Sequence, residues 1–229
     1  MINIALPETA TARKLSFFLA MEEYVARLQL ADDAFFLWQV EPSVIYGRNQ
    51  VVENEVNLEY CQAHDIQLFH RKSGGGCVYA DRDNLMLSYI TKEEQVGFAF
   101  NRFVNMVLLV LRKMGVEATG TRHNDIMIGD RKVCGTACRK TSYGSIVHST
   151  MLYDTNMQHM LQAITPSQQK LAKNGVESVR QRITLLKDYT LLTLDEVKTL
   201  IIRSLCNSER MLTADDVAQI EQIEKLYNP

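Results

Sequence analysis

Apolar residues recur at helical spacing in two long segments of the chain. In residues 11–29 the apolar positions fall on roughly one helical face and charged residues occupy the rest, which predicts an amphipathic helix. The residues on that face are Leu15, Phe18, Val25 and Leu28. Residues 98–114 are strongly apolar and end before Gly115, a residue type that often follows the last helical turn. We expect this second segment to be a buried helix packed on a sheet.

Short β-prone runs lie before and after the second helix. The expected strands are residues 35–40, 44–46, 66–70, 77–79, 85–90, 125–128, 131–134 and 145–154. The first two flank Glu41-Pro42-Ser43, a turn signal that predicts a hairpin or two adjacent strands. Gly129-Asp130 is a two-residue hairpin signal, because glycine supplies the positive φ that such a turn requires. Lys132 is therefore expected just past a tight turn.

The last third of the chain carries two helix-start signals. Thr193 with Glu196, and Thr213 with Asp216, each resemble a capping box before an apolar periodic run. No repeat, low-complexity tract or Pro/Gly-rich linker interrupts the sequence, so residues 1–229 are expected to form one α/β domain.

Composition narrows the classes of function. A chain of 229 residues with 46% hydrophobic residues can bury a substantial core, and a net charge of -2 provides no broad basic surface for nucleic acid. The N-terminal residues do not resemble a signal peptide, and no apolar run reaches the roughly 18 residues of a membrane span, so we expect a cytoplasmic protein. The five cysteines stand at irregular spacing, which is typical of reduced thiols.

One glycine run is a candidate ligand-binding loop. Residues 70–84, HRKSGGGCVYADRDN, place Gly74, Gly75 and Gly76 after two basic residues and before an expected strand. Without Cβ atoms the backbone N–H groups can approach an anion closely, and Arg71 and Lys72 supply compensating charge. This favours a phosphate or adenylate cradle, with a flexible turn between strands as the alternative. The spacing matches neither a P-loop nor a Rossmann fingerprint.

A second candidate segment is residues 123–140, HNDIMIGDRKVCGTACRK. A lysine held on a strand beside a hairpin loses less entropy on ordering than one on a mobile loop. Lys132 can thus hold a carboxylate and an α-phosphate together, as acyl-adenylate formation requires. Asn124 and Asp125 stand before the hairpin and could orient a nucleotide or a Mg²⁺ ion that bridges phosphates.

Six motifs resemble, in order and spacing, the catalytic domain of the lipoate-protein ligase A family, within the biotin/lipoate protein ligase superfamily. They are GRNQ (47–50), RKSGGG (71–76), ND (124–125), GDRKVCGTACR (129–139), HST (148–150) and ESVRQRIT (177–184). The resemblance implies a mixed, largely antiparallel sheet flanked by helices. It also implies a two-step reaction: lipoate and ATP form lipoyl-AMP, and the lipoyl group then moves to a lysine of an acceptor domain.

The resemblance assigns roles to individual residues. Lys132 matches the catalytic lysine that contacts both the acyl carbonyl and the phosphate, and Arg71 matches an arginine that contacts the nucleotide. His148 and Thr150 match a strand in which the family has glycine where this chain has Ser149. The residues expected to contact ATP, lipoate or lipoyl-AMP are Arg71, Ser73, Gly74, Gly75, Gly76, Cys77, Val78, Tyr79, Asn84, Asn124, Asp125, Lys132, His148 and Thr150. Asp125 is also the candidate Mg²⁺ ligand, and an apolar acyl pocket is expected, with Trp38 and Tyr46 near the first strands.

The chain departs from the family pattern in three places. Ala80 stands where the family usually has histidine, and Asp83 where it has glycine. Beyond Cys206 only one short helical segment, residues 213–227, is expected, so the C-terminal accessory domain of many ligases is predicted to be absent. Either a separate accessory chain would replace that domain, or the protein would work from preformed lipoyl-AMP. The implied acceptors are lipoyl domains of 2-oxoacid dehydrogenase complexes or the glycine-cleavage H protein.

Three alternatives remain open at this point. A cysteine-dependent octanoyl- or lipoyl-transferase would need a thiolate near the lysine, and Cys77, Cys134 and Cys138 lie within the motifs. Residues 120–123 lack the cysteine that we associate with such relatives, which favours the ligase. A biotin ligase is disfavoured because RKSGGG lacks the repeated arginines of that family's loop. A non-catalytic carrier-binding protein on the same fold is the third alternative, and the presence of Arg71 and Lys132 argues against it.

Overall fold

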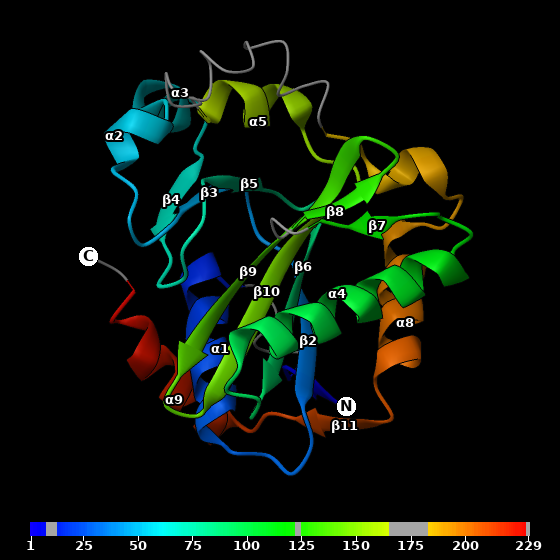
Figure 1. Ribbon diagram of the computed structural model, residues 1–229. Helices are drawn as coiled ribbons and strands as arrows, with labels where there is room; N and C mark the ends of the chain where they lie inside the picture. The colour runs from blue at the N-terminus through cyan, green and yellow to red at the C-terminus, as the bar shows by residue number, and fades with distance from the viewer. Residues whose placement is uncertain (8–12, 122–124, 165–182, 228–229) are drawn as a thin grey trace.

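The computed structural model describes residues 1–7, 13–121, 125–164 and 183–227. An eight-stranded sheet has the strand order β11-β1-β2-β6-β10-β9-β8-β7, and a three-stranded sheet has the order β4-β3-β5 (Figure 1). The strands of the large sheet are β1 (Ile2–Ala5), β2 (Ala34–Trp38), β6 (Asn84–Thr91), β7 (Thr119–Gly120), β8 (Asp125–Ile128), β9 (Arg131–Thr141), β10 (Gly144–Leu152) and β11 (Ser208–Met211). Those of the small sheet are β3 (Ser43–Tyr46), β4 (Gln67–His70) and β5 (Val78–Ala80).

Helices cover both faces of the large sheet (Figure 1). The helices of the described residues are α1 (Leu15–Arg27), α2 (Val52–Glu55), α3 (Leu58–Ala63), α4 (Val96–Lys113), α5 (Met157–Ala163), α8 (Leu194–Leu205) and α9 (Ala214–Glu224), with a short 3-10 helix η2 (Leu186–Tyr189); α2, α3 and α5 lie beside the small sheet. In the large sheet β1 pairs in parallel with β11 and β2, and the remaining described pairs are antiparallel. The prediction of a mixed, largely antiparallel sheet flanked by helices is confirmed.

Two apolar clusters lie on the two faces of the large sheet. One joins α1 and α9 to alternate residues of the central strands, such as Phe36, Met86 and Ile146. The other joins α4 and α8 to the intervening residues, such as Phe35 and Leu87. Because side chains of a strand alternate between the faces, strands covered on both sides are apolar at nearly every position. This explains why β6 and β10 are buried along their whole length.

The first predicted helix is present. It is more buried than predicted, because an amphipathic helix would expose one face to solvent. Helix α1 begins at Leu15, and all but two of its 13 residues are buried. Its outer side is covered by α9, which runs beside it (Figure 1).

Helix α4 is less buried than the sequence predicts. One face packs on the sheet through residues such as Phe103 and Leu111, whereas Phe98 and Leu109 are exposed, so the expected buried helix is half-buried.

The expected pairing of residues 35–40 with residues 44–46 is wrong. Strand β2 belongs to the large sheet, whereas β3 crosses to the small sheet and pairs with β4 and β5. The turn residues show that the chain changes direction but not which strand each run pairs with, because pairing depends on distant segments.

The predicted hairpin at residues 129–130 is confirmed, with Gly129 at φ +59°. Both predicted capping boxes are also confirmed, at Thr193 and Thr213.

Short elements at the periphery were not predicted from the sequence. These are the edge strands β1, β7 and β11 and the helices α2, α3 and α5. Each is short, and its local pattern is too brief to show a period. Among the described residues, no helix combines the length and apolar character needed to cross a membrane.

Candidate active site

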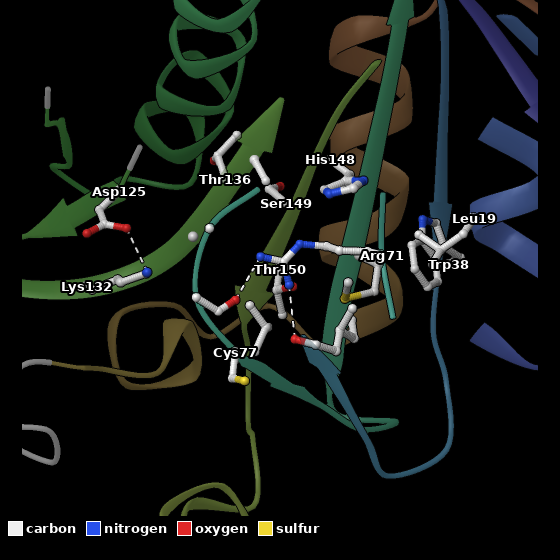
Figure 2. Close-up of a pocket in the computed structure, with 17 residues that line it drawn as sticks. Leu19, Trp38, Arg71, Cys77, Asp125, Lys132, Thr136, His148, Ser149 and Thr150 are labelled. Atoms are coloured by element: carbon white, nitrogen blue, oxygen red, sulfur yellow. Dashed lines mark hydrogen bonds and ion pairs between the residues drawn. The ribbon is translucent and has the colours of Figure 1, made fainter. Parts of the chain in front are cut away.

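A cavity of about 490 Å³ lies where the large sheet, the small sheet and α1 meet (Figure 2). Its lining comes from α1, β2, β3, β5, β6, β8, β9, β10 and the glycine loop that precedes β5. The lining residues are Leu19, Trp38, Ile45, Arg71, Gly75, Gly76, Cys77, Val78, Met86, Asp125, Lys132, Gly135, Thr136, Ala137, His148, Ser149 and Thr150. The two candidate segments found in the sequence, around Arg71 and around Lys132, therefore meet at one cavity.

The cavity has an apolar end and a charged end. Leu19 and Trp38 lie on one side in Figure 2, while Lys132 and Asp125 lie on the other, with Arg71 between them. Trp38 is held in place by stacking on Phe18, with ring centroids 4.9 Å apart. Such a cavity suits a ligand with an apolar chain and an anionic head.

A register shift in the sheet brings Lys132 to the cavity. Ile126 pairs with Cys134, but the next β8 residue, Met127, pairs with Lys132, so β9 has one extra residue at Val133. Side chains alternate along a strand, and the extra residue moves Lys132 to the face that carries Gly135. The ammonium group then lies 2.6 Å from the Asp125 carboxylate. Without the extra residue, Lys132 would lie on the same buried face of β9 as Cys134. With it, Lys132 lines the cavity.

The side chain of Lys132 lies against Gly135. A Cβ atom built on Gly135 would stand 2.8 Å from both Cε and Nζ of Lys132. That separation is too short for real side chains, so the path of the lysine depends on a glycine at this position. Sequence reasoning included Gly135 in a motif but assigned it no role.

Arg71 donates four hydrogen bonds to oxygens of the protein. The side chain is 4% exposed, and its guanidinium donates to Ser73 Oγ at 3.0 Å, to the Ile45 carbonyl at 3.0 Å, and to the carbonyls of Gly74 and Gly76 at 2.9 and 2.7 Å. Burial lowers the pKa of Arg71 to about 10. The guanidinium therefore holds the glycine loop in shape while lining the cavity, and its expected contact with a nucleotide stays a prediction.

A chain of buried hydrogen bonds connects the loop to the apolar end. Ser73 Oγ accepts from Arg71, so its hydroxyl hydrogen can point to His148 Nε2, 2.8 Å away. The Nδ1 of His148 then donates to Glu22, 3.0 Å from Oε2. Ser88 donates to Glu22 at 2.7 Å and accepts from Trp38 Nε1 at 2.9 Å. With its hydrogen on Nδ1, His148 joins Ser88 in donating to the buried carboxylate of Glu22, so the two bonds converge on one group.

The other predicted contacts divide into two groups. Gly75, Gly76, Cys77, Val78 and Thr150 line the cavity, and Gly75 has φ +101°, a conformation that favours glycine. Those that do not line it are Ser73, Gly74, Tyr79 and Asn84.

These four residues lie in the glycine loop or near the cavity without lining it. Tyr79 belongs to an apolar cluster under α3 and α5, and Asn84 donates to the carbonyl of Tyr79 at 3.3 Å. Tyr46 stacks on His70 and does not line the cavity. Asn124 and most of the ESVRQRIT motif lie outside the described residues.

Several residues of the site were missed by sequence reasoning. Glu22 and Ser88 are part of apolar helical and strand runs, and nothing local distinguishes them from surface polar residues. Leu19, Ile45 and Met86 are ordinary core residue types. Their roles follow from the packing of α1 against β6, which no local pattern shows.

Metal-ligand groups are sparse in this region. Within the described part of the chain, no three residues of the types His, Cys, Asp and Glu gather in a way that could hold a metal ion. The carboxylate of Asp125 is already paired with Lys132. A divalent cation here would need most of its ligands from phosphates and water.

Comparison with known proteins identifies the class to which this fold and cavity belong. Residues 15–206 match the family described as lipoyl protein ligase A/B catalytic domain, so the chain belongs to that family. It is 34% identical to lipoate-protein ligase 1 of Staphylococcus aureus (strain Mu50) over 218 residues, which is 92% of this chain and 66% of that protein. It is 32% identical to lipoate-protein ligase LplJ of Bacillus subtilis (strain 168), with 90% of this chain and 66% of that protein covered. The chain thus spans just under two thirds of the length of these relatives.

Solved structures support the fold. A bipartite lipoate protein ligase from Thermoplasma acidophilum, described with its E2 lipoyl domain, superposes with a TM-score of 0.84 at 24% identity, covering 98% of this chain and 91% of that one. Lipoate-protein ligase A bound with ATP gives a TM-score of 0.80 at 24% identity, covering 98% and 93%. The family resemblance and the fold predicted from it are confirmed.

Proposed function

We propose that this chain is a lipoate-protein ligase that activates lipoate with ATP to lipoyl-AMP and transfers the lipoyl group to a lysine of an acceptor domain. The observation that carries the proposal is the position of Lys132. Its ammonium lies at the charged end of a cavity whose other end is apolar and whose wall includes glycine backbone. Relatives at 34% and 32% identity that bear the name lipoate-protein ligase support it.

In the first step a lipoate carboxylate oxygen attacks the α-phosphorus of ATP, and pyrophosphate leaves. The dithiolane and its alkyl chain occupy the apolar end, beside Leu19 and Trp38, where burial of apolar area favours binding. Lys132 exchanges its partner Asp125 for ligand oxygens and offsets the negative charge that builds up at phosphorus. Backbone N–H groups of Gly75 and Gly76 are available along the same wall.

In the second step the amine of the acceptor lysine attacks the carbonyl of the mixed anhydride, and AMP leaves. Lys132 polarises that carbonyl, so one cation serves both steps and no protein nucleophile is needed. Asp125 is the residue that would hold Mg²⁺, which when bound would neutralise the phosphates. Its Oδ1 is paired with Lys132, so this oxygen becomes available when the lysine turns to the ligand.

The finer assignments extend the same proposal. The acceptors are lipoyl domains of 2-oxoacid dehydrogenase complexes or the glycine-cleavage H protein, and the solved pairing of an archaeal ligase with its E2 lipoyl domain supports the first. Residues 1–229 act as one catalytic domain. The reaction takes place in the cytoplasm, where ATP is available.

Intact-mass spectrometry of an acceptor lipoyl domain tests the proposal. The acceptor is incubated with this protein, lipoate, ATP and Mg²⁺, and in a parallel sample with synthetic lipoyl-AMP alone. A mass gain of one lipoyl group in the first sample supports the complete reaction. A gain only in the second indicates that activation requires another chain. An unchanged acceptor in both samples would refute the proposed function.

Thiol chemistry is the alternative route, and Cys134 and Cys138 are poorly suited to it. Burial raises the pKa of Cys134 and of Cys138 to about 11, so both are protonated thiols at neutral pH. We expect Cys77→Ala, Cys134→Ala and Cys138→Ala, tested singly in the acceptor assay, each to retain most of the lipoylation activity. Complete loss of activity with any one of them, in a folded variant, would favour the cysteine-dependent transferase.

A further inference from the structure

Two consecutive residues of the glycine loop are anchored to two consecutive glutamates of α1. Ser73 reaches Glu22 through His148, on the cavity side. Lys72 points the other way and contacts Glu23 directly, with Nζ 2.7 Å from Oε1. The loop is therefore held from both sides, and the outer anchor lies away from the cavity lining.

The outer anchor gathers three donors on one oxygen of the Glu23 carboxylate, and Arg27 Nη2 lies 3.6 Å from the other oxygen. Glu23 Oε1 accepts from Lys72, from Arg139 Nη2 at 2.9 Å and from the hydroxyl of Tyr227 at 2.6 Å. Burial opposes ionisation of Glu23, but the hydrogen bonds from Lys72 and Tyr227 and the charge of Arg139 keep its pKa below the ordinary value. The carboxylate is only 11% exposed, so the cluster is partly shielded from solvent.

Tyr227 contributes twice to this cluster. Besides donating to Glu23, it places its ring under Lys72, with the ammonium 4.2 Å from the ring centroid. Tyr227 itself is 7% exposed and lies just after α9, which packs along α1. The residue lines no part of the cavity, so it affects the ligand only indirectly, through the residues that it contacts.

We propose that Tyr227 is a positioning residue: acting through Glu23 and Lys72, it holds the glycine loop in the shape that binds the acyl-adenylate. The inference rests on the ligase function proposed above, and it makes the segment after α9 a working part of the site. Without the hydroxyl and ring of Tyr227, Lys72 keeps one acceptor and turns more readily to solvent. The inner anchor through Ser73 remains, so the loop loosens but stays attached.

The chain offers a matched control for this proposal. Tyr24 on α1 donates to Asp216 on α9, which makes a second buried tyrosine-to-carboxylate hydrogen bond between α1 and the C-terminal part of the chain. Among the described residues, Tyr24 makes no hydrogen bond, ion pair or ring contact with residues 71–77. Tyr24→Phe therefore weakens the packing of α9 on α1 in a comparable way without touching the loop.

Amide hydrogen exchange of residues 71–77, measured on the intact chain without ligand, tests the positioning directly. We expect Tyr227→Leu to speed exchange in this segment about tenfold, which corresponds to about 1.4 kcal/mol, and Tyr227→Phe, which keeps the ring, to have a smaller effect. Lys72→Met should reproduce the change, and Lys72→Arg should restore wild-type exchange. Tyr24→Phe should leave the segment at the wild-type rate.

Steady-state kinetics provide the second measurement. Loosening of the binding loop should raise the KM for lipoate several-fold in Tyr227→Leu and leave kcat nearly unchanged, because Lys132 is not moved. Wild-type exchange of residues 71–77 in Tyr227→Leu would overturn the inference, as would equal acceleration in Tyr24→Phe. A wild-type chain without lipoylation activity would refute the proposed function instead, and the exchange comparison would still decide whether Tyr227 positions the loop.

Discussion

Replacing Lys132 with alanine is expected to lower the rate of lipoate-dependent pyrophosphate release by about 10²–10³-fold. In the proposed reaction this ammonium stabilises charge at phosphorus in the first step and at the carbonyl in the second. The fold should tolerate the change, since the Lys132–Asp125 pair is partly exposed, at 36% and 31% for the two side chains, and such pairs contribute little to stability.

Lys140→Ala is the matched control for that variant. Lys140 lies on the same strand, β9, and pairs with Glu94 at 3.0 Å with both side chains exposed. Its removal should leave pyrophosphate release unchanged. If Lys132→Ala retained wild-type rates while unfolding at the wild-type temperature, Lys132 would not be the catalytic cation.

The second large effect is expected from Gly135→Ala. The added methyl group would stand 2.8 Å from Cε and Nζ of Lys132, so the flexible end of the lysine must move away. A displacement of about 1 Å in a positioned group can reduce the rate about a hundredfold. Stability should change by no more than about 1 kcal/mol, because the side chain that yields is mobile and lies at the cavity.

A double-mutant cycle separates this explanation from general damage to β9. On a Lys132→Ala background, Gly135→Ala has no ammonium to displace and should cause little further loss of rate. Equal losses on both backgrounds would show that Gly135 acts by another route. The cycle is measured by pyrophosphate release at saturating lipoate and ATP.

The parts of the site that could be predicted from the sequence are those with local signals. The Gly129-Asp130 turn placed Lys132 next to a hairpin, and the triple glycine marked a loop at the cavity. The bulge at Val133, which turns Lys132 to the cavity face, has no such signal. A bulge arises from the fit of β8 to β9 and is visible only once both strands are placed.

The features that could not be predicted depend on contacts between residues far apart in the sequence. Glu23 and Tyr227 are 204 positions apart, and their hydrogen bond follows from the packing of α9 on α1. Arg71 was expected to contact a nucleotide, but its residue type alone does not reveal that four protein oxygens take up its donors. The pairing of β2 and β3 was predicted wrongly for the same reason, because each strand finds its partners far away in the sequence.

The central claim is that Lys132 bridges acid and phosphate in a ligand bound along the glycine loop. Calorimetric titration of the intact protein with a stable sulfamoyl analogue of lipoyl-adenylate tests it most directly. The account predicts that the wild-type chain binds the analogue and that Lys132→Ala binds it about a hundredfold more weakly, while Lys140→Ala matches the wild type. Equal affinity of the wild-type chain and Lys132→Ala for the analogue would contradict the account.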